Sequence, residues 1–146
     1  VLAENSEYNC SGVCRMPRSH SLNSLSRMSM PSRNSPPPGV PMKCTAGLHH
    51  PIRHYNSEVS SNMHGFLNVF GAGILAYTDG FDESELLEVL DEEDPYEFVF
   101  GEDGFEWNNT KVPIAEIKEA REKFMISYGS CSFDEPIEDL KTLELL

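Results

Sequence analysis

The stretch Met63-His-Gly-Phe-Leu-Asn-Val-Phe-Gly-Ala-Gly-Ile-Leu-Ala-Tyr77 is apolar on nearly every side. Its length and composition predict a helix over 63–77, with Asn62 as the capping residue. A helix without a polar face is stable only when other elements cover most of its surface, and ~14 apolar residues are too few to span a bilayer. We therefore expect this helix to be buried. Small residues would let its neighbours approach closely: Gly65, Gly71, Ala72 and Gly73.

The segment before this helix has the pattern of a buried strand followed by a loop. Val40-Pro-Met-Lys-Cys-Thr45 is a short apolar run with one lysine, and Gly47 closes it. Buried strands of α/β proteins have this composition. A loop over 48–54 follows and begins with two adjacent histidines after Leu48. A buried strand followed by a buried helix favours the α/β class.

The segment after the buried helix predicts a second helix and a β-hairpin. Asp82, with Glu85 three residues later, has the capping-box pattern and opens a helix over 83–92. Residues 97–107 alternate with period two on either side of the turn 101–104, which predicts a β-hairpin.

Two more helices are expected towards the end of the chain. Pro113 suits the first turn of an amphipathic helix to about Tyr128, with Glu119 and Lys123 paired at i,i+4. A last short helix is expected over 136–143, opened by Asp134 and Pro136. The first of these helices should turn four side chains towards the core: Ile114, Ile117, Phe124 and Met125.

The N-terminal part has a different composition. Residues 17–41 contain no acidic and no aromatic residue, and seven serines lie between Ser19 and Ser35. Such a segment cannot bury enough apolar surface to offset the entropy of ordering it. We expect residues 1–38 to be a largely unstructured tail and Ser/Pro-rich linker, and residues 39–146 to be an α/β domain.

The charge distribution argues against nucleic-acid binding. The net charge is −13 over 146 residues. Residues 1–63 hold six basic and three acidic side chains, whereas residues 64–146 hold five basic and 21 acidic ones. An acidic surface repels phosphate backbones. We therefore expect no nucleic-acid partner, and the absence of a long apolar run predicts no membrane association.

The four cysteines are unevenly spaced and indicate free thiols in a reducing, cytoplasmic compartment. Cys10 and Cys14 form a C-x₃-C pair, to which His20 or Cys44 would add a third metal ligand. No second short-spaced pair accompanies them. We predict no metal site, and the sequence names no cofactor.

Three residues near the first predicted strand are candidate catalytic groups. Lys43 stands near the C-terminal end of that strand, the end at which α/β barrels place their active sites. It would form a Schiff base or hold an anion; alternatively, its stem is buried while its amine reaches solvent. His49 and His50 are candidate acid–base groups.

A second set of polar residues is expected to bind the ligand. Gly129-Ser-Cys-Ser-Phe-Asp-Glu135 is a loop rich in hydroxyls and carboxylates before a helix, where backbone amides bind anions. Cys131 would also serve as a nucleophile with a histidine base. Alternatively, Ser132 and Asp134 cap the helix and Cys131 packs as a small apolar residue. The candidate ligand-binding residues are Arg53, His64, Asn68, Ser130, Cys131, Ser132 and Asp134.

Three segments resemble signature segments of an uncharacterised family of longer proteins in bacteria and plants. They are Lys43-Cys-Thr-Ala-Gly-Leu-His-His-Pro51, Met63-His-Gly-Phe-Leu-Asn-Val-Phe70 and Gly129-Ser-Cys-Ser-Phe-Asp-Glu-Pro136. The resemblance covers residues 39–146 and implies a β/α-barrel-like fold. It also implies that this chain is similar to the C-terminal part of a longer protein, so we expect a barrel fragment with a β-hairpin insertion. It supplies no reaction.

Two function classes follow from these patterns. The first is an enzyme-like barrel fragment that binds a small anionic or carbonyl-containing molecule through Lys43, His49 and His50. The second is a non-catalytic or degenerate α/β module that acts in protein interaction. The sequence leaves the substrate and the oligomeric state open.

Overall fold

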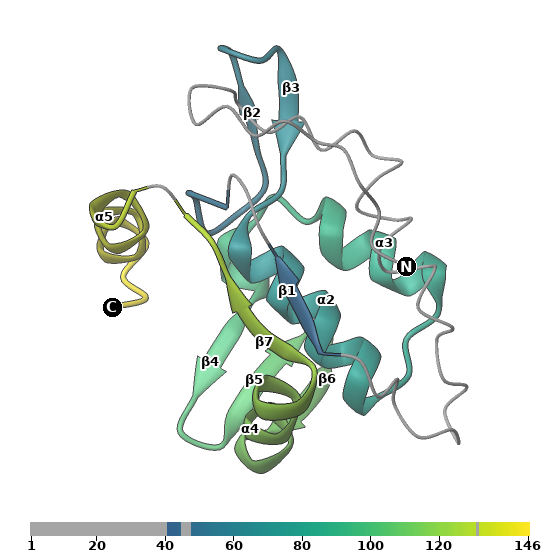
Figure 1. Ribbon diagram of the computed structural model, residues 1–146. Coiled ribbons are helices and arrows are strands. Elements are labelled where there is room, and N and C mark those ends of the chain that lie inside the picture. The colour runs from purple at the N-terminus through teal and green to yellow at the C-terminus, as the bar shows by residue number, and fades with distance from the viewer. Residues whose placement is uncertain (1–40, 45–47, 131) are drawn as a thin grey trace.

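The computed structural model describes residues 41–44, 48–130 and 132–146 of the chain and shows a mixed α/β fold (Figure 1). The α/β class is therefore confirmed. The predicted tail and linker over 1–38 lies outside the described residues, as do Cys10, Cys14 and Cys131.

Helix α2 (Phe66–Thr78) is the buried helix that the sequence predicts, but it begins later than expected. Its N-cap is Gly65 rather than Asn62. The preceding residues instead form strand β3 (Ser61–Met63), which pairs antiparallel with β2 (His54–Asn56). This hairpin was not predicted, since each of its strands has only three residues, too few for a clear alternation.

The predicted helix over 113–128 is wrong in its second half. Helix α4 (Ile114–Lys123) ends at its C-cap Phe124, and Met125–Tyr128 forms strand β7. Strand β7 runs parallel to β1 (Met42–Cys44), and these hydrogen bonds replace a further helical turn. Phe124 and Met125 are buried in a strand as they would be on a helix face, so the apolar pattern alone could not separate the two structures. Ile114, expected in the core, is 60% exposed.

The segment between α2 and α4 contains the predicted helix and hairpin, together with a strand, β6, that was not predicted. Helix α3 (Glu83–Asp91) carries the expected capping box, because Asp82 Oδ1 accepts from Glu85 N at 3.0 Å and Asp82 N donates to Glu85 Oε2 at 2.8 Å. A 3₁₀ turn, η1 (Pro95–Glu97), leads into the expected hairpin. Three strands then form one antiparallel sheet: β4 (Val99–Gly101), β5 (Gly104–Trp107) and β6 (Thr110–Pro113).

The core forms where α2 meets α3, α4 and the β4–β6 sheet (Figure 1). The small residues of α2 allow this packing, as the sequence predicts. A Cβ on Gly71 would lie 3.1 Å from the Phe98 ring, and one on Gly73 would lie 2.5 Å from Met125 Cγ. The ring and thioether side chains therefore reach the helix backbone.

The chain ends in helix α5 (Asp134–Thr142), which begins two residues before its predicted start. In Figure 1 it stands beside the end of β7, away from the core helices. Among the described residues, no helix combines the length and the apolar character needed to cross a membrane.

Candidate functional site

The parallel strands β1 and β7 place two loops side by side. Gly129, just after β7, donates its backbone N–H to the carbonyl of Cys44 at 2.8 Å. The loop with His49 and His50 therefore leaves the same end of the strand pair as the loop with Ser130 (Figure 1). In open α/β sheets, ligand sites form at the carboxyl ends of the strands.

The first turn of α2 holds the histidine loop in place. Phe66 N donates to the carbonyl of His50 at 3.0 Å, and Leu67 N donates to that of Pro51 at 2.9 Å. These bonds satisfy backbone groups that a helix start leaves unpaired. Only glycine fits at position 65, because a Cβ there would lie 2.2 Å from the Pro51 oxygen.

Asn68 ties this loop to the end of α3. Its buried side-chain oxygen accepts from the backbone N–H of Arg53 at 2.8 Å and from that of Gly65 at 3.2 Å. Its amide nitrogen donates to the carbonyls of Val89 at 2.9 Å and Glu92 at 2.8 Å. The whole hydrogen-bonding capacity of the Asn68 amide is thus used within the chain.

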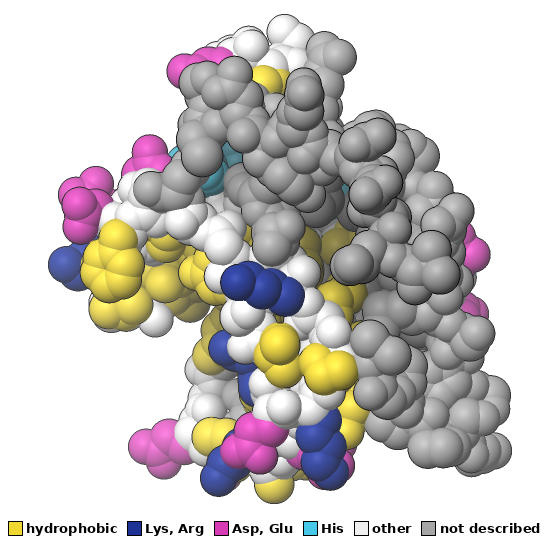
Figure 2. Space-filling model, in the orientation of Figure 1, with side chains coloured by type: hydrophobic (Ala, Val, Ile, Leu, Met, Phe, Trp, Pro, Cys, Tyr) yellow, Lys and Arg dark blue, Asp and Glu magenta, His cyan; other side chains and the backbone are white. Residues whose placement is uncertain are grey.

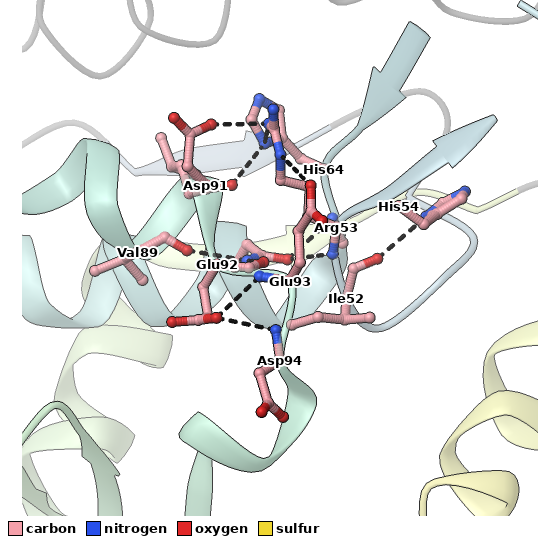
Figure 3. Close-up of polar contacts among 12 residues, drawn as sticks. Ile52, Arg53, His54, His64, Val89, Asp91, Glu92, Glu93 and Asp94 are labelled. Carbon is pink, nitrogen blue, oxygen red and sulfur yellow. Dashed lines mark hydrogen bonds and ion pairs between the residues drawn. The ribbon is translucent and has the colours of Figure 1, made fainter. Parts of the chain in front are cut away.

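Arg53 and His64 lie in the same network (Figure 3). The Arg53 guanidinium is 3% exposed and pairs with Asp91 Oδ1 at 2.9 Å and Glu93 Oε1 at 3.6 Å. His64 Nδ1 lies 3.1 Å from the Leu90 carbonyl and 3.4 Å from the guanidinium. A carbonyl only accepts and a guanidinium only donates, so one tautomer serves one of them, and the shorter distance favours donation to Leu90. The hydrogen-bonding groups of Arg53, His64 and Asn68 therefore hold the loop in place. They are the same groups that a bound ligand would have to contact.

Two histidine–carboxylate pairs join the loop to α5. His49 Nδ1 lies 2.9 Å from Glu135 Oε2, and His50 Nδ1 lies 2.6 Å from Asp139 Oδ2. An ionised carboxylate only accepts hydrogen bonds, so each Nδ1 donates. The bond from His49 lowers the pKa of Glu135, and the Ser132 hydroxyl adds to the effect. Since Glu135 and Asp139 are one helical turn apart, they face the two histidines together.

The arrangement leaves His50 with a proton-accepting nitrogen. With Nδ1 protonated, the neutral ring carries its lone pair on Nε2, which has no hydrogen-bond partner among the described residues. The His50 side chain is 39% exposed, so solutes can reach it. A carboxylate that orients a histidine through Nδ1 is the arrangement of many general bases.

His54, which sequence reasoning did not select, lies beside His50. Their ring centroids are 4.3 Å apart with the rings nearly perpendicular. His54 Nδ1 donates to the Ile52 carbonyl at 3.1 Å, and its buried Nε2 has no partner in the described part of the chain. None of Glu135, Asp139 and His54 is among the candidate site residues of the sequence. One signal in the sequence could have indicated the two carboxylates. Glu135 and Asp139 are spaced i,i+4, and two adjacent histidines, His49 and His50, stand elsewhere in the chain.

The loop after β7 meets the histidines through Ser130, whose Oγ lies 3.4 Å from His49 Nδ1. Ser132 Oγ accepts from Glu135 N at 3.2 Å in the first turn of α5, but the N-cap of this helix is Phe133 rather than Ser132 or Asp134. Asp134 is exposed in the first turn of α5.

Lys43 lies opposite Ser127 in the register of β1 and β7. Its side chain is exposed, so the desolvated ammonium expected for an imine-forming lysine is absent. No contact within the described ranges joins it to His49, His50 or Ser130. The structure thus brings the two histidines together with the loop after β7, and leaves the lysine at the surface of the strand pair.

No group of three or more His, Cys, Asp or Glu side chains in the described parts of the chain could hold a metal ion. Comparison with protein-family models, with curated proteins and with solved structures finds no match.

Proposed function

We propose that the chain carries an acid–base site centred on His50, which acts on a small anionic or carbonyl-containing compound in the cytoplasm. The observation that carries this proposal is the 2.6 Å contact between His50 Nδ1 and Asp139 Oδ2. It holds Nδ1 of a partly exposed imidazole against a carboxylate and leaves Nε2 without a partner among the described residues. His49, with Glu135, is the second acid–base group.

In this proposal, Lys43 acts as a solvated cation near the site rather than as an imine former. Its exposure supports that role, since an exposed ammonium attracts a carboxylate or phosphate without losing its charge. The loop with Ser130, Cys131 and Ser132 and the first turn of α5 with Asp134 would border the ligand. Arg53, His64 and Asn68 position the histidine loop.

We also propose that the domain is part of a β/α barrel. Strand β1, helix α2 and strand β7 form a unit in which two parallel strands flank a helix, the repeating unit of such barrels. The elements from α3 to α4 are inserted between α2 and β7. Each strand of this unit ends beside the candidate site.

Solvent-deuterium exchange tests the acid–base proposal without a known substrate. A base that removes a proton α to a carbonyl replaces it with deuterium in D₂O, which NMR detects. We expect faster exchange with the protein for at least one of pyruvate, 2-oxoglutarate and dihydroxyacetone phosphate. His50→Gln should slow this exchange at least ~100-fold, because general bases contribute about 10²–10⁴-fold.

Asp139→Asn should also slow the deuterium exchange. Glu122→Gln, at an exposed position on α4, should leave the exchange rate unchanged. The proposal fails if none of the compounds exchanges faster with the protein, or if His50→Gln and Glu122→Gln exchange at the same rate.

A second candidate function is protein interaction, which the exposed apolar side chains favour. Figure 2 shows hydrophobic side chains gathered beside α5 and a hollow between α5 and the part that holds β4–β6 and α4. Phe133 is 81% exposed, and Val99 and Phe100 on the edge strand β4 are each 52% exposed. Sedimentation would show self-association that Phe133→Ser or Phe100→Ser weakens if the substituted side chain contacts a second copy; a monomer at all concentrations would exclude that partner.

A further inference from the structure

A pocket of about 330 Å³ lies where the turn after α2, the first turns of α3 and the turn between β5 and β6 meet. It shares no residue with the histidine site. Its volume is at the lower end of the range for small-molecule sites. The lining residues are Asp79, Phe81, Glu85, Glu88, Trp107, Asn108 and Thr110.

The side chains that line this pocket favour a positively charged ligand. Three of the lining side chains are carboxylic acids and none is basic. Asp79 Oδ2 accepts from Thr78 Oγ1 at 2.9 Å, and Glu85 Oε2 accepts from Asp82 N at 2.8 Å, so hydrogen bonds hold both carboxylates in place. Such a lining repels anions and attracts cations.

The spacing of the carboxylates argues for an organic cation over a metal ion. These three acidic side chains are not among any described group close enough to hold a metal. An organic ammonium ion does not need ligands that converge on one point, because each of its N–H groups can donate to a separate acceptor.

Trp107 supplies an independent signal for a ligand atom. The residue is 5% exposed, and its indole Nε1 is buried without a hydrogen-bond partner among the residues that the structure describes. An indole nitrogen can only donate, and a buried donor without an acceptor carries its full desolvation cost. An oxygen on a ligand removes that cost when it reaches Nε1, which requires the side chains that cover this atom to change rotamer, as commonly happens on binding.

The aromatic wall of the pocket is compatible with such a ligand. The rings of Phe81 and Trp107 meet edge to face with centroids 6.3 Å apart. Tryptophan is the aromatic side chain that attracts cations most strongly.

We propose that this pocket binds a small organic ammonium compound that carries a hydroxyl or carbonyl oxygen. The ammonium group faces the carboxylates of Asp79, Glu85 and Glu88, and the oxygen accepts a hydrogen bond from Trp107 Nε1. Both features are required together, because the carboxylates alone would accept any cation and the indole alone any acceptor.

The chain contains one tryptophan, so it carries its own reporter. A ¹H–¹⁵N correlation spectrum shows a single indole signal, which moves when the indole proton gains an acceptor. Three probes separate the two features of the ligand: glucosamine has both, cyclohexylamine has the ammonium without the oxygens, and glucose has the oxygens without the ammonium. We expect glucosamine at about 20 mM, the range of weak ligands, to move the indole signal more than either of the others.

Variants then assign the contacts. Glu88 is exposed, so Glu88→Gln should fold normally and weaken glucosamine binding at least threefold, while Glu122→Gln on α4 should leave it unchanged. In Trp107→Phe, measured by saturation-transfer NMR on the ligands, the preference for glucosamine over cyclohexylamine should disappear. The proposal is overturned if the indole signal does not move with glucosamine, if glucose moves it equally, or if Glu88→Gln binds like Glu122→Gln.

Discussion

Replacing Asn68 with alanine should be among the most damaging single changes in the described part of the chain. The side chain is fully buried and makes four hydrogen bonds to backbone groups of Arg53, Gly65, Val89 and Glu92. Alanine leaves two N–H donors and two carbonyl acceptors without that partner. The change also separates the loop that carries His50 from the end of α3.

The size of the effect follows from these contacts. Each buried group that loses its partner costs about 1–3 kcal/mol. The group at Glu92 is only partly buried and can bind water, and alanine favours the helix by roughly 0.5 kcal/mol. We therefore expect Asn68→Ala to lower the free energy of unfolding by about 3–5 kcal/mol, a large part of the ~5–15 kcal/mol that stabilises a domain.

Urea denaturation followed by the fluorescence of Trp107 measures this change. Asn62→Ala is the matched control, because Asn62 is exposed in β3 and its substitution should stay within about 0.5 kcal/mol of the wild type. A loss below about 1 kcal/mol for Asn68→Ala would show that the four hydrogen bonds are not made or that water replaces them.

Three further predictions concern Gly65, Glu135 and Lys43. Gly65→Ala should destabilise the protein by about 2–4 kcal/mol, because the new Cβ would overlap the Pro51 oxygen, whereas Gly101→Ala, with nothing within 4 Å, should cost much less; equal losses in urea denaturation would contradict this. Folding lowers the pKa of Glu135 below its ordinary 4.5, so its contribution is present above pH 4.5 and is lost as the pH falls through the folded-state pKa. The difference in stability between wild type and Glu135→Gln should therefore shrink below pH 4.5, and a constant difference would exclude the pairing. Borohydride trapping with pyruvate should label Lys43 no more than the exposed lysines of α4, and selective labelling at Lys43, read by mass spectrometry, would restore the imine mechanism.

Patterns in which the interacting groups are close along the chain could be predicted from the sequence. The capping box of Asp82 and Glu85 spans three residues, and the hairpin of β4 and β5 is set by its alternation and its turn. The buried position of α2 follows from its lack of a polar face. In each case the decisive hydrogen bonds or contacts are local, or the composition excludes an exposed position.

The tertiary structure decided what depends on partners far along the chain. Residues 125–128 became a strand because β1, some eighty residues earlier, offers its edge, and nothing in Phe124 or Met125 themselves separates strand from helix. The pairing of His50 with Asp139 spans 89 residues, and the pocket at Trp107 is built from three separate segments. Residue types alone indicated which groups could do chemistry. Only the tertiary structure determined which of them meet, because a contact between distant segments leaves no periodic signal in the sequence.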